Sequence, residues 1–211
     1  MMLSSMMLIV QPIIRTDWIR LTTQIILTKR VHANMNVNLE LFKTINQLAN
    51  HQKIIDQLMI FLTNQAPVLC GITWLLMLLY TLKRHLIAQR TILLWSACAT
   101  VVALLINYGI GHWYYSARPF VSTQISHVTT LIGHKADSSF PSKHTTGSWT
   151  LAFTSLGVSK KLSIWLFSLA FIIGFSRIYV GVHWPSDILG GILLAAVVAS
   201  VTRLVSKKVQ R

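Results

Sequence analysis

The sequence predicts an all-α fold, a polytopic bundle of about five transmembrane helices. Of its 211 residues, 53% are hydrophobic and only 11% are charged, whereas soluble domains carry roughly 25% charged residues. Two long stretches contain no Asp, Glu, Lys or Arg, and short basic clusters separate the apolar stretches. This alternation is typical of multi-pass membrane proteins.

Five apolar stretches are candidates for the spans. A transmembrane helix needs about 20 predominantly apolar residues, and roughly 17 to 25 are tolerated. The two uncharged stretches, 58–82 and 91–117, meet this length. Three further stretches, at about 141–159, 162–176 and 185–202, lie near its lower limit. We therefore predict five spans.

The basic residues predict the orientation of the bundle. They follow the first, third and fifth predicted spans, as Lys83, Arg84, Arg90, Lys160, Lys161, Arg203, Lys207, Lys208 and Arg211. Under the positive-inside rule these connectors lie in the cytoplasm. The 118–140 loop, the start of the third span and the 176–187 turn then face outward. Polar residues gather in these three places, so we expect an outward-facing active site.

Four parts follow along the chain. We expect 1–34 to be an N-terminal extension that is not part of the natural product, because its basic residues strain the predicted topology. In 35–57, apolar residues recur near helical spacing, which indicates an interfacial helical segment. Residues 58–205 form the transmembrane domain, and 206–211 form a basic cytoplasmic tail.

The charge pattern and the two cysteines argue against nucleic acid binding, a disulfide framework and a cysteine metal site. The net charge of +14 alone is compatible with nucleic acid binding. The basic residues stand in clusters between spans, however, so we expect membrane lipids as the anionic neighbour and no nucleic acid. Cys70 and Cys98 both lie in apolar stretches and indicate neither a disulfide framework nor a metal site.

Two Arg, two His, one Ser and one Asp fall at span boundaries on the outward side. They are Arg118, Ser142, His144, Arg177, His183 and Asp187. Each has a structural explanation of its own. A terminal Arg can reach the lipid headgroups, Ser after Pro suits a helix start, and an acid in a first turn favours the helix dipole. Together on one side, they indicate a functional site.

The residue types suit phosphoryl transfer, in which negative charge spreads over the phosphate oxygens. Arg118 and Arg177 offer bidentate forks. The helix start at Ser142 and Lys143 offers backbone N–H groups and a hydroxyl. The Lys143 ammonium either supplies a further positive charge to the phosphate or points to solvent, and the sequence leaves both alternatives open.

Two histidines provide the reactive groups in this hypothesis. His183 is the expected nucleophile, with Asp187 orienting its other ring nitrogen. His144 is the expected general acid, which protonates the leaving group. We expect no metal and no other cofactor.

These motifs resemble the type 2 phosphatidic acid phosphatase superfamily. Its signature is Lys-x6-Arg-Pro, then Pro-Ser-Gly-His, then Ser-Arg-x5-His-x3-Asp. The third motif is complete from Ser176 to Asp187. Two positions depart from the signature, because Gly111 stands at the first Lys and Lys143 at the Gly.

Within that superfamily, 35–205 resembles the bacitracin-resistance type of undecaprenyl-diphosphate phosphatase. The resemblance rests on the segment from Met35 to Asn46 and on Ala136-Asp137-Ser138-Ser139-Phe140-Pro141-Ser142-x-His144-Thr145-Thr146-Gly147. It implies a bacterial plasma-membrane hydrolase that converts undecaprenyl diphosphate to the monophosphate during carrier-lipid recycling. It also implies a phosphohistidine intermediate.

The sequence leaves other interpretations open. A phosphatase for another lipid phosphate, such as phosphatidylglycerophosphate or lipid A, fits the same motifs. A haem or metal protein would use His112, His144 and His183, but no zinc spacing is present. A transporter would call for internal repeats, and the sequence shows none. The oligomeric state is left open.

Overall fold

The computed structural model describes residues 20, 23–24 and 37–209. The chain divides into two compact units, Met1–Glu40 and Leu41–Arg211, and the second contains all the helices from α2 to α6. The expected extension at 1–34 lies almost wholly outside the described residues. The described part is helical, with no strand, so the predicted all-α class is confirmed.

Four helices are long and apolar enough to cross a membrane. They are α2 (Lys53–Lys83), α3 (Ile87–Trp113), α5 (Lys160–Tyr179) and α6 (Pro185–Val209). At about 1.5 Å per residue, even the shortest reaches roughly 30 Å, the thickness of the hydrocarbon core. The protein is therefore a multi-pass membrane protein.

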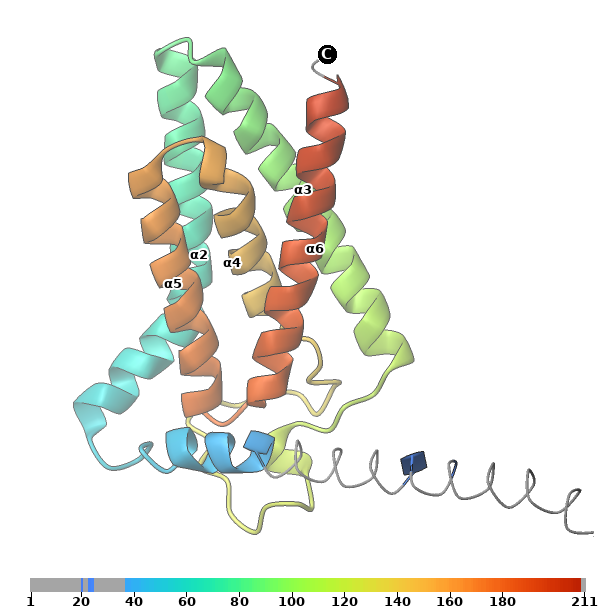
Figure 1. The fold of residues 1–211 in the computed structure, drawn as a ribbon. Helices are drawn as coiled ribbons and strands as arrows, with labels where there is room; N and C mark the ends of the chain where they lie inside the picture. The colour runs from blue at the N-terminus through green and yellow to red at the C-terminus, as the bar shows by residue number, and fades with distance from the viewer. Residues whose placement is uncertain (1–19, 21–22, 25–36, 210–211) are drawn as a thin grey trace, which may run out of the picture. The chain divides into compact units, whose positions relative to one another are not determined.

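The fifth predicted span is a shorter element in the middle of the bundle. Helix α4 (Lys143–Thr154) has 12 residues and is followed by the 3-10 turn η2 (Ser155–Gly157). It packs against α3, α5 and α6 (Figure 1). Its buried residues are mostly small and polar, and Thr150 donates to the Thr146 carbonyl at 2.7 Å. Because protein and not lipid surrounds α4, the length rule for lipid-facing helices does not apply to it.

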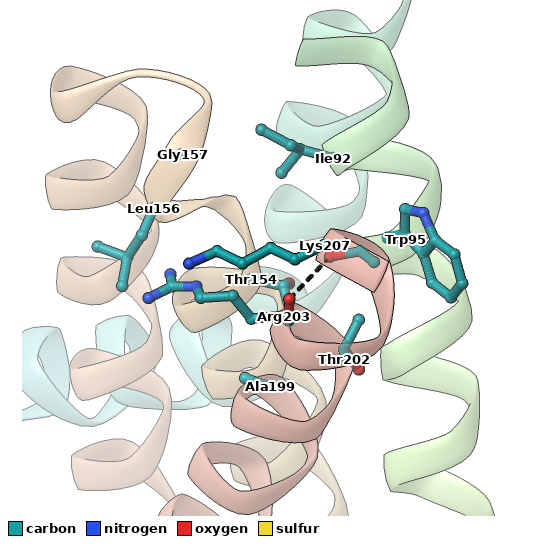
Figure 2. A pocket seen from close by; sticks show the side chains of 10 residues that line it. Ile92, Trp95, Thr154, Leu156, Gly157, Ala199, Thr202, Arg203 and Lys207 are labelled. Carbon is teal, nitrogen blue, oxygen red and sulfur yellow. Dashed lines mark hydrogen bonds between the residues drawn. The ribbon is translucent and has the colours of Figure 1, made fainter. Parts of the chain in front are cut away.

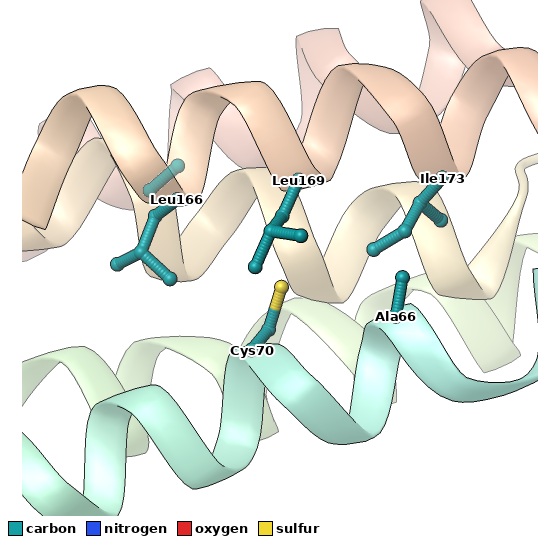
Figure 3. Close-up of a cluster of buried hydrophobic side chains, with 6 residues drawn as sticks. Ala66, Cys70, Leu166, Leu169 and Ile173 are labelled. Atoms are coloured by element: carbon teal, nitrogen blue, oxygen red, sulfur yellow. The ribbon is translucent and has the colours of Figure 1, made fainter. Parts of the chain in front are cut away.

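Helices α2 and α5 pack through small residues. Ala66 and Cys70 of α2 meet Leu166, Leu169 and Ile173 of α5 in a buried cluster (Figure 3). The short side chains bring the two helices close together, and the Cys70 thiol fills the gap as a small hydrophobe. Both Cys70 and Cys98 are free thiols.

The segment 41–49 packs on the same end of the unit as the C-terminus of α5. The Asn46 amide donates to the carbonyls of Thr129 at 2.8 Å and Tyr179 at 3.0 Å, and it accepts from the Thr129 N–H at 3.0 Å. The Tyr179 hydroxyl donates to Asp56 at 2.9 Å. The Asn46 side chain thus joins the loop after α3 to the end of α5. The membrane depth of this segment stays a prediction.

The turn between α5 and α6 depends on a glycine. Gly181 has a φ of +82°, and a Cβ there would collide with the Thr129 carbonyl oxygen. Only glycine combines this left-handed backbone with so close an approach. The turn therefore lies tightly on the loop after α3, which positions the residues of both segments side by side.

Candidate active site

Ends of four helices meet where the polar motifs were predicted to gather. The C-termini of α3 and α5 and the N-termini of α4 and α6 lie at one end of the bundle, with the loop 114–142 across them (Figure 1). Helix α3 ends at Trp113, short of the predicted 117, because the chain turns extended toward Arg118 and Pro119. This leaves Arg118 in the loop, free to fold back over the bundle.

His183 and Asp187 form a buried pair. The His183 Nδ1 lies 3.3 Å from Asp187 Oδ2, with side chains 3% and 1% exposed. The Trp184 N–H also donates to Oδ2 at 2.8 Å, which holds the carboxylate in place. On the other side of the ring, Nε2 lies 3.4 Å from the Arg118 Nη1. An N–H donor faces Nε2 and an acceptor faces Nδ1, so the favoured tautomer keeps a lone pair on Nε2.

The His183 imidazole is neutral in the site without ligand. Burial, followed by the charges of Arg177 and Arg118, holds the pKa of His183 well below its ordinary value. A neutral ring with its lone pair on Nε2 is the form that a nucleophile requires. The arrangement predicted from the His-x3-Asp spacing is therefore present.

Arg118 is buried beside His183. Its side chain is 3% exposed, so it does not extend to the lipid headgroups, and the alternative of a headgroup anchor is wrong. Its Nη1 donates to the Val182 carbonyl at 2.8 Å, and its Nε and Nη2 reach Asp137 Oδ1 at 2.9 and 2.8 Å. The turn and the loop together fix this guanidinium.

Arg177 is buried with two donors unused. Its side chain is 2% exposed, and Nη1 donates to the Thr63 hydroxyl at 3.2 Å. Within the part of the chain that the structure describes, its Nε and Nη2 have no partner. A buried guanidinium without an acid partner is costly unless a ligand supplies the negative charge. This makes Arg177 the clearest sign of an anion site.

The N-terminus of α4 closes another side of the site. Ser142 is its N-cap residue, but its side chain makes no capping bond; the hydroxyl instead accepts from Thr145 at 3.0 Å. The Ser142 N–H donates to the Asp187 carbonyl at 3.1 Å, which ties the start of α4 to α6, the helix that carries Asp187. The N–H groups of the first helical turn have no partners within the helix and can face an anion.

His144 and Lys143 occupy that first turn. His144 is half-buried and lies outside the four candidate spans. Burial and then the charge of Arg177 lower its pKa to about 4, so without ligand it is neutral, whereas the expected role of general acid needs a protonated ring. Lys143 is 55% exposed, and its Nζ lies 3.9 Å from Asp137 Oδ2. The ammonium thus lies beside Asp137 while much of the side chain stays exposed to solvent, so both alternatives for Lys143 stay open.

Two residues of the loop were not assigned a role from the sequence. Asp137 pairs with Arg118 and lies beside Lys143. Burial opposes its ionisation, yet the Arg118 guanidinium holds the pKa of Asp137 below its ordinary value. His134 contacts the His183 ring edge to face, with centroids 6.4 Å apart. In the sequence, the one sign that His134 and Asp137 could belong to the site was their position shortly before the Pro-Ser-x-His motif.

A small cavity lies where the first-motif cation is missing. Its volume is about 140 Å³, and it is bordered by Gly111, Asp137 and Lys143 among others. At Gly111 a Cβ would meet nothing closer than 3.5 Å, so there is room for a larger side chain. Among the described residues no group of three or more His, Cys, Asp or Glu is placed to hold a metal. His112 instead stacks with Tyr108, with centroids 6.4 Å apart.

Several known proteins are similar in sequence to this chain over most of its length. The chain is 35% identical over 162 residues to undecaprenyl-diphosphatase BcrC of Bacillus subtilis, covering 77% of this chain and 80% of that protein. It is 36% identical over 166 residues to the putative undecaprenyl-diphosphatase YbjG of Escherichia coli, covering 75% and 77%. A relative from Sulfolobus acidocaldarius named undecaprenyl-diphosphatase is 33% identical, covering 77% and 75%.

Two solved structures share the fold. LpxE of Aquifex aeolicus has a TM-score of 0.63 and 24% identity, covering 79% of this chain and 94% of that one. The phosphatidylglycerolphosphate phosphatase of Bacillus subtilis also has a TM-score of 0.63, at 20% identity, covering 85% and 89%. Both likenesses concern the helical architecture.

Fold and site define an integral membrane protein with buried Arg and His side chains gathered at one end of a helical bundle. The PAP2 superfamily model matches 91–211. The chain belongs to the PAP2 superfamily, and the resemblance found in its motifs is confirmed.

Proposed function

We propose that the protein is a lipid-diphosphate phosphatase that hydrolyses undecaprenyl diphosphate to undecaprenyl phosphate and inorganic phosphate. The single observation that carries the proposal is Arg177, a buried cation with two donor nitrogens that have no partner among the described residues, in the same sequence motif as the His183–Asp187 pair. The names of the relatives from Bacillus subtilis and Escherichia coli support the choice of substrate.

In the first step the His183 Nε2 attacks the terminal phosphorus. A nitrogen–phosphorus bond forms, and the bond from phosphorus to the bridging oxygen breaks. Arg118, Arg177, Ser142 and the first-turn N–H groups of α4 hold the terminal phosphate oxygens and meet their growing charge. Asp187 stabilises the positive ring that results.

In the second step water releases the phosphate. A water molecule attacks the phosphorus of the phosphohistidine, His144 accepts its proton, and the bond to Nε2 breaks. Inorganic phosphate leaves and His183 is free again. For the first step His144 must carry a proton, and the negative charge of a bound diphosphate favours the protonated ring. The leaving lipid phosphate takes that proton.

Lys143 and the cavity beside Gly111 belong to the proposed substrate site. A diphosphate carries one phosphate more than the nucleophile attacks, and Lys143 borders the cavity that lies next to Asp137. We place the second phosphate there, with the Lys143 ammonium as its counter-charge in place of the first-motif Lys. We propose no metal and no other cofactor in the reaction.

The proposed location is the bacterial plasma membrane, with the site on the outer side. The basic clusters at 83–90, 160–161 and 203–208 lie at the opposite end of the bundle, which the positive-inside rule assigns to the cytoplasm. Hydrolysis on the outer side would return the carrier lipid to the monophosphate form. Less lipid diphosphate would remain there, which would give bacitracin resistance if the antibiotic targets that form.

A phosphate-release panel on detergent-solubilised protein tests the proposal. The substrates are undecaprenyl diphosphate, undecaprenyl phosphate, phosphatidylglycerophosphate and lipid A, each with and without chelator. We expect the highest kcat/KM on undecaprenyl diphosphate, unaffected by chelator, and no activity in His183→Ala. A higher value on phosphatidylglycerophosphate or lipid A would assign the enzyme to that lipid instead.

A further inference from the structure

A larger cavity lies at the end of the bundle opposite the candidate active site. Its volume is about 510 Å³, and it opens between the N-terminal half of α3, the end of α4 with η2, and the C-terminal half of α6 (Figure 2). Ile92, Trp95, Leu156 and Ala199 give it apolar walls. None of the residues assigned to phosphate chemistry borders it.

Two cations border the cavity from one helix. Arg203 and Lys207 stand four residues apart on α6, and both side chains extend toward η2 across the opening (Figure 2). Among the described residues neither forms an ion pair with an acid. A smaller cavity of about 340 Å³, which also includes both side chains, adjoins on the face formed by Phe153 and Leu204.

The charge of this end of the bundle is of one sign. Every acid of the described residues lies at the other end or in 37–56, while the chain segments at this end carry Lys83, Arg84, Arg90, Lys160, Lys161, Arg203, Lys207 and Lys208. Unpaired cations beside apolar walls complement a molecule with an anionic head and a hydrocarbon tail. In a membrane protein that molecule is at hand in the adjacent leaflet.

We propose that this cavity binds one anionic phospholipid from the leaflet on that side. Its phosphate lies on Arg203 and Lys207, and an acyl chain lies against Ile92, Leu156 and Ala199. The apolar walls argue for a lipid over free phosphate, since a small anion leaves them in contact with water. The site is separate from the proposed catalytic function and does not depend on it.

Native mass spectrometry tests the proposal. The purified protein is exposed to mixed micelles that contain phosphatidylglycerol and phosphatidylcholine with identical acyl chains, and the retained lipid is counted. We expect preferential retention of one phosphatidylglycerol. The double variant Arg203→Ala with Lys207→Ala should lose roughly thirtyfold in that preference, as two basic contacts to an anionic lipid imply.

Two further variants separate a site from general attraction. Lys160→Ala with Lys161→Ala removes the same charge from the same end but from outside the cavity, and it should retain the lipid. Ser206→Trp fills the cavity and keeps both cations, so it should lose the lipid; the Ser206 hydroxyl bonds only to its own helix. Equal losses in both double variants, or retention in Ser206→Trp, would overturn the proposal. Displacement of the bound phosphatidylglycerol by inorganic phosphate would also overturn it.

Discussion

At the scale of single residues, Arg177 is a buried cation that has no acid partner among the residues that the structure describes. It is buried, it donates to the Thr63 hydroxyl, and its Nε and Nη2 have no partner among the described residues. Removing such a cation relieves a desolvation cost in the empty protein and destroys the anion site. Stability and activity should therefore change in opposite directions at this position.

We expect Arg177→Met to raise the unfolding free energy of the ligand-free protein by about 1 to 3 kcal/mol and to lower kcat/KM by roughly 10² to 10³. Inorganic phosphate should raise the melting temperature of the wild type and leave that of the variant unchanged. Thermal unfolding in detergent measures both. A variant less stable than the wild type would show that Arg177 serves the fold.

Asp187 should act by orienting His183. Asp187→Asn keeps the size of the side chain but offers an amide to Nδ1, which favours the tautomer with its proton on Nε2. We expect a fall in kcat of roughly 10⁴ with little loss of substrate binding. Rapid-quench labelling with a substrate carrying ³²P in its terminal phosphate should show slow, acid-labile phosphate in this variant and none in His183→Ala. Label in His183→Ala would exclude His183 as nucleophile.

Asp137 occupies the fork of Arg118 in the absence of substrate. Both Arg118 bonds go to one carboxylate oxygen at 2.8 and 2.9 Å, so a phosphate must compete with it. We expect Asp137→Asn to lower the inhibition constant of inorganic phosphate by about tenfold. This corresponds to about 1.4 kcal/mol of Arg118–Asp137 attraction that phosphate no longer has to replace. Product-inhibition kinetics measure this, with Ser138→Ala as the neighbouring control. Weaker phosphate inhibition in the variant would contradict the competition.

At the scale of elements, α4 joins the chemistry to the packing of the bundle. The sequence predicted a helix there and placed Ser142 and His144 in its first turn, because Pro and Ser mark a helix start. Its short length was not predicted, since an apolar count cannot distinguish a helix surrounded by protein from one surrounded by lipid. His134 was missed because its contact with His183 depends on how the long loop folds.

His144 should matter most when the leaving group is a poor one. A lipid monophosphate expels an alkoxide, whereas a diphosphate expels a phosphate whose last proton has a pKa near 6. We therefore expect His144→Ala to lower kcat/KM by roughly 10² to 10⁴ on a monophosphate and by less on the diphosphate. Phosphate release on matched prenyl substrates tests this. Equal losses on both would remove the general-acid role.

Helix α6 approaches α4 through glycine. A Cβ at Gly191 would stand 3.1 Å from the Ser142 carbonyl oxygen and from Thr145 and Thr146, whereas one at Gly109 in α3 meets nothing within 4 Å. Gly191→Val should therefore push α4 away, cost about 1 to 3 kcal/mol and reduce activity. Gly109→Ala should stabilise its helix by up to about 1 kcal/mol. Similar melting temperatures for both variants would argue against this packing.

On the scale of the whole molecule, one end of the bundle carries only basic charged residues among those described, whereas the candidate-site end carries both acids and bases. Composition and basic clusters sufficed to predict a multi-pass fold, and motif spacing sufficed to predict the His183–Asp187 pair. Neither predicted that Asp137 would neutralise Arg118, because that contact joins two parts of one loop through tertiary folding. The imidazoles gathered at the candidate active site have a consequence for stability.

Acid should destabilise the fold. Burial keeps the pKa values of His134, His144 and His183 below the ordinary 6.5. Below pH 6.5 these imidazoles bind protons in the unfolded chain but stay neutral in the folded protein. The free energy of unfolding therefore falls as the pH decreases. Each imidazole contributes up to about 1.4 kcal/mol per pH unit. The melting temperature should drop between pH 6.5 and 5, less steeply in His144→Gln. A melting temperature that rises with acid would contradict this.

Asn46 contributes no group to the chemistry, yet it bonds to both the N–H and the carbonyl of Thr129 and to the end of α5. These bonds hold the loop that carries His134 and Asp137 in place, although Asn46 itself lies outside the site. We expect this loop to open for substrate entry and phosphate release, and such an opening would break these bonds. The Thr129 amide should therefore exchange with deuterium as slowly as a helical amide, and Asn46→Ala should speed both that exchange and the loop's breathing. The turnover rate would then be governed by a residue that never meets the substrate.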